Sequence, residues 1–263
     1  MNRSLINNNI KQDEDVYLLE NSGSLNKFEK DYLNVREKEG RIFPDKVVKA
    51  LPFLPISQPL KNEWLHRAAT QQRFNRYLSK RKNAESILDL GCGNGWFTSK
   101  LNLVLPRAQI LGLDVNITEL HQARRVFTSN QICFAYGDIF ADNFARHSFD
   151  MIILNASIQY FPDLKLLVNR LLELLKAGGE IHILDSPFYN TEQQKLAAKK
   201  RSETYFSGMQ AEQMAQYYYH HTFSSLQDYS FKILHKPTSL RRISSLLTGK
   251  TISLFPWICI SKS

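Results

Sequence analysis

The sequence predicts an α/β protein built on a mostly parallel sheet with helices on both faces. Three observations lead to this prediction. Apolar, strand-like segments alternate with helix-like segments from Ser86 onward, three alternate glycines follow the first of these strands, and acidic residues follow the next two. The 263 residues are enough for one large core.

Period-2 and buried apolar runs set the predicted strands, and amphipathic runs set the helices between them. Strands are expected at Ser86–Leu90, Gln109–Leu113, Ile132–Tyr136, Phe149–Leu154 and Gly179–Leu184, and late strands at Ser230–Leu234 and Leu254–Ile260. Helices are expected at Gly95–Leu103, Thr118–Phe127 and Asp163–Leu175, the last ended by Gly178-Gly179.

The segments before and after this alternating core have their own patterns. Residues 1–25 are polar and predict a loose arm, residues 26–41 an amphipathic helix, residues 47–60 an extended proline-rich linker, and residues 61–80 a helix. Residues 186–219 are helical in tendency and rich in aromatics, and residues 240–247 form a basic, helix-like piece. We therefore expect an N-terminal extension over residues 1–60 and a main domain over residues 61–263.

Composition limits the classes of protein that fit. The sequence is 43% hydrophobic and 22% charged, which is typical of a globular protein, and no apolar run is long enough to span a membrane. The three cysteines, Cys92, Cys133 and Cys259, indicate no disulfide framework and fit the cytoplasm. The net charge of +9 lies in residues 1–81 and 191–263, so it predicts a solvated exterior or, as an alternative, a nucleic-acid partner.

The glycine-rich turn is the most specific motif. Gly91, Gly93 and Gly95 alternate after an apolar strand, so that a ligand can lie against bare backbone. A dinucleotide-binding turn needs glycine at its sixth position, where this chain has Trp96. No Lys-Ser/Thr pair follows the glycines, which disfavours a nucleoside-triphosphate loop.

The run Asp89-x-Gly91-x-Gly93-x-Gly95 resembles the first motif of the class I S-adenosylmethionine (SAM)-dependent methyltransferases. This resemblance implies a Rossmann-like sheet of seven strands that ends in an antiparallel pair. It also implies SAM as the cofactor, S-adenosylhomocysteine (SAH) as its product, and methyl transfer as the reaction. The resemblance covers about residues 62–262 and is strongest over residues 86–185.

The cofactor-binding residues follow from the resemblance, strand end by strand end. They are Asp89, Gly91, Cys92, Gly93, Gly95, Asp114, Val115, Asp138, Ile139, Asn155 and Ala156. Asp89 orders the turn and the ammonium end, Asp114 accepts the ribose hydroxyls, and Asp138 accepts from the adenine amino group. The alternatives are structural: Asp114 as a helix N-cap and Asp138 as a turn cap.

The acceptor is expected over the same strand ends, near residues 155–160, 186–189 and the aromatic-rich segment. Tyr160, His220 and His221 are the candidate catalytic residues, with a histidine as base where the acceptor must lose a proton. The alternative is that this aromatic helix belongs to the core. The spacing of the histidines shows no metal-ligand pattern, so we expect no metal.

The predicted function is SAM-dependent methylation of a small-molecule acceptor by in-line displacement. Asn155-Ala156-Ser157-Ile158 lacks the prolines usual in enzymes that methylate nucleobase amines. Two alternatives stay open: methylation of ribosomal or transfer RNA, and SAM binding without transfer.

Overall fold

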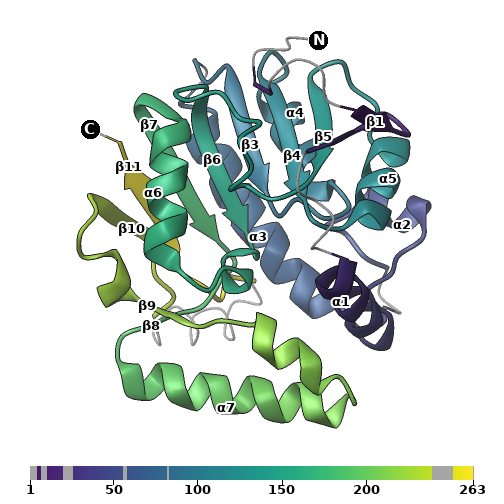
Figure 1. The fold of residues 1–263 in the computed structure, drawn as a ribbon, viewed down its shortest axis with the longest axis vertical. Coiled ribbons are helices and arrows are strands. Elements are labelled where there is room, and N and C mark those ends of the chain that lie inside the picture. Colours follow the sequence, from purple (N-terminus) through teal and green to yellow (C-terminus); the bar gives the residue numbers. More distant parts are fainter. Residues whose placement is uncertain are drawn as a thin grey trace.

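A nine-stranded sheet forms the centre of the molecule (Figure 1), with strand order β1-β2-β5-β4-β3-β6-β7-β11-β10. The computed structural model describes residues 5–6, 11–19, 26–55, 58–81, 83–238 and 251–262. All seven predicted strands are present, in the order β5-β4-β3-β6-β7-β11-β10, and β11 and β10 form the predicted antiparallel pair. The prediction of a Rossmann-like α/β fold is therefore confirmed.

The strand bounds lie close to the predicted ones. The strands of this sheet are β1 Lys11–Asp13, β2 Val16–Leu18, β3 Ser86–Leu90, β4 Gln109–Asp114, β5 Ile132–Tyr136, β6 Phe149–Asn155, β7 Leu175–Leu184, β10 Phe231–His235 and β11 Trp257–Ser261. A separate parallel pair consists of β8 Phe188–Tyr189 and β9 His221–Thr222.

Helices surround the sheet. They are α1 Asn26–Lys38, α2 Asp45–Ala50, α3 Lys61–Leu78, α4 Trp96–Val104, α5 Ile117–Val126, α6 Leu164–Leu174 and α7 Glu192–Gly208. Short 3₁₀ helices are η2 Ile158–Tyr160, η3 Glu212–Tyr217 and η4 Phe223–Leu226. No helix in the described ranges is both long and apolar enough to cross a membrane.

Both faces of the sheet are buried, which explains why its central strands are continuous apolar runs. Along β3, Ile87 points to the face covered by α3 and α4, whereas Leu88 points to the face covered by α6. Helix α5 packs on the first of these faces at the β5 end. Strands β3, β4, β5 and β6 run parallel, so their carboxyl ends lie together at one edge of the sheet, where ligands of such folds bind.

The N-terminal segment departs from the prediction, because a loose arm is wrong for residues 11–19. Strand β2 pairs in parallel with β5, and Val16, opposite Phe134, is fully buried. Leu19 packs where a side chain on Gly137 would lie, since a Cβ there would come within 2.6 Å of the Cβ of Leu19. Pairing with β5 thus orders a segment whose own sequence is mostly polar.

Two other predictions need correction. The linker over residues 47–60 is not wholly extended, because α2 begins after Pro44, and proline is well tolerated at a helix start. Gly178-Gly179 does not end a helix: α6 ends at Leu174, and the glycines lie inside β7 where its register with β6 shifts. Gly178, with φ of +72°, permits this irregularity. The basic piece at residues 240–247 lies outside the described residues.

Helix α7 and the 3₁₀ helix η3 lie across the carboxyl end of the sheet together with α1 (Figure 1). Phe206 and Met214 pack against Val35 of α1 in a small apolar cluster. The aromatic-rich segment is therefore helical over α7 and η3 but begins with the short strand β8, and it packs against the N-terminal helix at the strand ends.

Phe74 of α3 is the centre of an aromatic cluster and provides a test of the core. Its ring is fully buried and lies 5.4 Å from Trp257 and 5.1 Å from His182, centroid to centroid. We expect Phe74→Ala to lower the free energy of unfolding by about 3–5 kcal/mol in urea denaturation. Leu103→Ala is the control, because Leu103 is 73% exposed. Equal losses from the two variants would contradict this assignment of the core.

Candidate SAM-binding site

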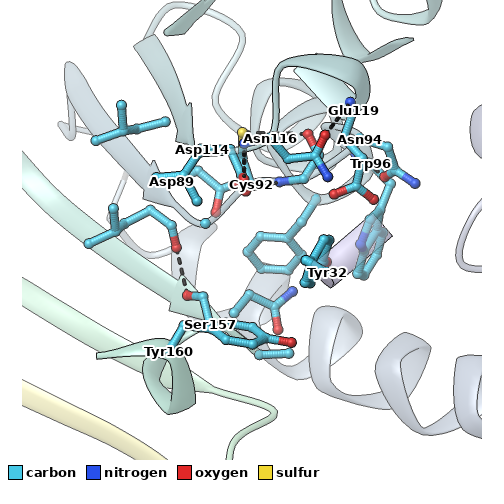
Figure 2. Close-up of a pocket in the computed structure, with 18 of the residues that line it drawn as sticks. Tyr32, Asp89, Cys92, Asn94, Trp96, Asp114, Asn116, Glu119, Ser157 and Tyr160 are labelled. Carbon is cyan, nitrogen blue, oxygen red and sulfur yellow. Dashed lines mark hydrogen bonds between the residues drawn. The ribbon is translucent and has the colours of Figure 1, made fainter. Parts of the chain in front are cut away.

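A cavity lies at the carboxyl ends of β3 to β6 (Figure 2). All eleven residues that the sequence predicted for the cofactor line it or belong to its turns. The lining includes Asp89, Gly91, Cys92, Gly93, Asp114, Val115, Asp138, Ile139, Asn155 and Ala156, while Gly95 supports the turn from beneath. Residues from α1 and α3, among them Phe28, Tyr32, Arg36, Trp64 and Arg67, close the cavity from the other side.

The glycine turn connects β3 to α4 and needs glycine for two reasons. Gly91 and Gly95 have φ of +76° and +73°, which strains residues with side chains. A Cβ on Gly91 would come within 2.4 Å of the Cβ of Ser157, and one on Gly95 within 2.8 Å of that of Ala123. The turn is therefore pressed against the β6 loop on one side and against α5 on the other.

Asp89 anchors the turn from below. Its carboxylate accepts a hydrogen bond of 2.6 Å from the hydroxyl of Thr98 on α4, and the residue is 1% exposed. Burial raises the pKa of Asp89 to about 7, and the Thr98 hydrogen bond opposes this rise. Asp89 thus ties the end of β3 to the helix that follows it.

Asp114, at the end of β4, holds the turn from the side. Its Oδ2 accepts from the backbone N–H of Gly93 at 2.7 Å, and its Oδ1 accepts from the N–H of Asn116 at 3.0 Å. Burial raises the pKa of Asp114 to about 6, although the backbone hydrogen bonds lower it. The N-cap of α5 is Asn116, not Asp114.

Glu119 is a site residue that the sequence reasoning missed. It occupies the third position after Asn116, whose Oδ1 accepts from the Glu119 N–H at 3.0 Å. In a capping box the glutamate would bond back to the N-cap N–H, but Asp114 already accepts that hydrogen bond. The Oε2 of Glu119 is therefore left buried without a partner, close to Gly93. Burial, and next the charge of Asp114, raise the pKa of Glu119 to about 7.

The remaining predicted contacts come from β5 and β6. Asp138 accepts from the backbone N–H of Phe140 at 3.1 Å, so it caps a turn, and it also lines the cavity beside Ile139. Ala156 has φ of +57°, and its neighbour Ser157 donates to the carbonyl of Leu90 at 2.7 Å. The β6 loop is thereby fixed to the end of β3 (Figure 2).

A second cavity adjoins the first. Its walls come from α1, α3, α7 and the ends of β6 and β7, and its volume is about 750 Å³. Tyr160 lines both cavities, and burial raises the pKa of its phenol. His220 lines only the second cavity, with Nε2 3.2 Å from the Ser202 hydroxyl, and burial lowers its pKa to about 4.

His221 is placed differently from its neighbour. It is 6% exposed, its Nε2 lies 3.2 Å from the carbonyl oxygen of Ile158, and it lines neither cavity. His221 therefore does not line the second cavity, and its role as a base stays a prediction.

A polar cluster far from both cavities consists of Glu180, His182 and Cys259, whose ligand-type atoms lie within 4.8 Å of one another. Trp257 donates to Nδ1 of His182 at 3.1 Å, which leaves the ring proton on Nε2, 3.4 Å from Glu180. Tyr77 donates to Glu180 at 2.6 Å. These hydrogen bonds join α3, β7 and β11, while Nε2 of His182 has no hydrogen-bond partner among the described residues.

The glycine turn at the switch point of the sheet, with acids at the ends of β3 and β4 and after β5, defines a protein of the SAM-binding α/β class. The chain matches the methyltransferase domain family over residues 81–235, which is more than half of its length. It therefore belongs to the class I SAM-dependent methyltransferases.

Individual relatives agree with this family. The chain is 30% identical over 133 residues to a malonyl-(acyl-carrier protein) O-methyltransferase of Priestia megaterium, covering 50% of this chain and 47% of the relative. It is 34% identical over 117 residues to a trans-aconitate 2-methyltransferase of Deinococcus radiodurans, covering 44% of this chain and 43% of the relative. The chain thus spans less than half the length of these curated relatives.

The fold also matches a solved structure along most of the chain. The plantazolicin methyltransferase BpumL, solved in complex with SAH, superposes with a TM-score of 0.51 at 19% identity. The match covers 91% of this chain and 98% of that one.

The buried acids of the site predict how stability depends on pH. Asp114 and Glu119 have raised pKa values of about 6 and 7 in the folded, ligand-free protein. Between about pH 5 and pH 8 the folded state holds protons that the unfolded chain releases, so the free energy of unfolding falls as the pH rises. We expect Glu119→Gln to reduce this slope in urea denaturation series.

Asp45→Asn is the matched control for this pH series. Asp45 pairs with Arg125 on the surface, and hydrogen bonds from Arg125 and Gln122 lower its pKa to about 2. Its contribution therefore changes only well below pH 5. An equal slope for the wild type and Glu119→Gln would contradict the assignment of a raised pKa to Glu119.

Proposed function

We propose that this protein transfers the methyl group of SAM to a small-molecule acceptor. One observation carries this proposal: the cavity built on the glycine turn adjoins a second, larger cavity, and the two share lining residues that include Tyr160 and Ala156. A cofactor in the first cavity would thus face an acceptor in the second.

The residues of the first cavity fit SAM. Glu119 Oε2, Asn116 Nδ2 and Asn155 Oδ1 are buried without partners among the described residues, and they face a cavity. Two acceptors and one donor match a ligand that carries hydroxyl, ammonium and carboxylate groups, because each buried polar atom needs a partner. When bound, SAM supplies a methyl group made electrophilic by its sulfonium.

The chain's own groups divide the work of binding. In this proposal the turn at Gly91–Gly95 and the N-terminus of α4 receive the carboxylate end, with Asp89 fixing the turn. Asp114 and Glu119 hold the ribose, and Asp138 with Ile139 holds the adenine. Tyr160 would position the acceptor, while His220, uncharged at neutral pH, is the candidate base for an acceptor that must lose a proton.

The acceptor cavity supports a small substrate. A volume of about 750 Å³ lies within the usual range for small-molecule sites. The two relatives named above act on a malonyl group carried by a protein and on trans-aconitate, as their names state. Three free cysteines fit a reducing compartment, and we propose the cytoplasm. The division at residue 60 stays a prediction.

Transfer of labelled methyl from SAM into fractionated cell extract tests the proposal. Label in a low-mass fraction that resists nuclease and protease supports it. Label lost on ribonuclease treatment would favour an RNA acceptor instead. SAM binding without any transfer would favour a binding protein that does not catalyse transfer.

Asp114→Asn tests the cofactor assignment. We expect it to weaken SAM binding by about 1–3 kcal/mol in calorimetry, because it removes charge-assisted hydrogen bonds within the site. Asp228→Asn is the control, since Asp228 pairs with Lys165 on the surface, and it should leave the affinity unchanged. NAD should show no saturable binding. Unchanged SAM affinity in a folded Asp114→Asn variant would exclude Asp114 from the site.

A further inference from the structure

The wall between the two cavities is unusually basic. Six residues line both cavities: Tyr32, Arg36, Arg41, Arg67, Ala156 and Tyr160. If the proposed function holds, the methyl group crosses at this wall. The reacting atom of the acceptor is therefore surrounded by three guanidinium groups and two phenols.

Two of these arginines are already neutralised. Arg41 binds both carboxylate oxygens of Glu63, at 2.7 and 2.5 Å, and its Nε lies 2.8 Å from Glu39. Arg67 also binds Glu63, at 3.1 Å. Burial works to raise the pKa of Glu63, but the two arginines outweigh it and hold the pKa at about 2, so Glu63 stays ionised.

Arg36 lacks a carboxylate as close as those that bind the other two arginines, although the charges of Glu119, Glu39 and Asp114 also act on it. Its guanidinium makes one hydrogen bond within the described ranges, to Glu39, and this contact is long at 3.4 Å. The same guanidinium lies 4.7 Å from the ring centroid of Tyr32, one helical turn earlier on α1. Its side chain is 23% exposed and lines both cavities.

The side chains that line the second cavity also carry a net positive charge. Arg201 adds a fourth guanidinium, while Glu39, Glu63 and Asp185 supply three carboxylates, which leaves one positive charge in excess. Asp185 accepts from the hydroxyl of Thr70 at 2.5 Å, and burial raises its pKa to about 6. Because the pKa of His220 is lowered, its ring is uncharged at neutral pH.

We infer that the acceptor presents a carboxylate to the methyl donor, with Arg36 as the residue that orients it. A planar guanidinium with free donors matches a carboxylate in geometry and charge. One carboxylate oxygen forms a bond to the methyl carbon as the carbon–sulfur bond breaks, and that electron pair stays on sulfur. The products are a methyl ester and SAH. No proton is released, so this reaction needs no general base.

The chemical stability of the product tests this inference, which rests on the proposed function. The full-length protein is incubated with methyl-labelled SAM and the small-molecule fraction of a cell extract, and the product is treated with dilute alkali. A methyl ester releases volatile labelled methanol, whereas methyl groups on nitrogen, carbon or an ether oxygen stay in solution. We expect most of the label to become volatile. Label that stays non-volatile would overturn the inference.

Variants at Arg36 test the orienting role. Arg36→Gln should lower kcat/KM for the labelled acceptor about tenfold or more, since a hydrogen bond to a charged group is lost, and Arg36→Lys should restore part of it. Arg107→Gln removes the same charge at an exposed position that lines neither cavity and should change nothing. Equal kcat/KM for Arg36→Gln and Arg107→Gln would exclude Arg36.

A binding experiment separates failure of this inference from failure of the proposed function. The SAH-loaded protein is titrated with saturated dicarboxylates from malonate to adipate and with the matching diamides. At least one dicarboxylate should bind more tightly than its diamide, and Arg36→Gln should abolish the difference. If no transfer occurs but this preference holds, only the proposed catalysis fails. Equal binding of acids and amides would overturn the carboxylate inference alone.

Discussion

The close approach between the β3–α4 turn and its neighbours is the constraint on which the rest of the site depends. The turn has the β6 loop on one side and α5 on the other, with separations that leave no space for a Cβ on Gly91 or Gly95. Gly91 donates to the carbonyl of Leu113 at 2.8 Å, and Gly93 donates to Asp114. Three strand ends are thereby held in one arrangement, and the cavity is the space that their loops leave open.

The N-terminal segment completes that cavity rather than merely preceding the domain. Helix α1 supplies Phe28, Tyr32 and Arg36 to its lining, and Glu29 accepts from the backbone N–H of Ile117, the first residue of α5, at 2.7 Å. This contact joins α1 to α5, the helix that carries Glu119. A hydrogen bond thus connects two of the helices that line the cavity.

Much of the fold could be predicted from the sequence, because the central strands are buried on both faces and read as unbroken apolar runs. The strands β1 and β2 at the edge of the sheet could not be predicted. Strand β2 has only three residues, and it is ordered by its pairing with β5 and not by its own composition. The prediction that Gly178-Gly179 end a helix was wrong, because glycine after a helical pattern also occurs in irregular strands. The motif led to residues that line the first cavity, whereas the positions of Glu119 and Arg36 beside it depend on spatial neighbours that the sequence does not reveal.

The charged side chains that line the two cavities suit ligands of different charge. Four carboxyl groups, from Asp89, Asp114, Glu119 and Asp138, line only the first cavity, and three guanidinium groups line both cavities. A ligand with positive groups would pair with these carboxyl groups and a ligand with a negative group with the guanidinium groups, since buried charges require partners of opposite sign. A cationic ligand in the first cavity would also favour ionised Asp114 and Glu119, which a raised pKa makes costly in its absence. In the proposed function, the guanidinium groups at the shared lining would face the acceptor and the carboxyl groups the cofactor, which suits an in-line transfer between the two.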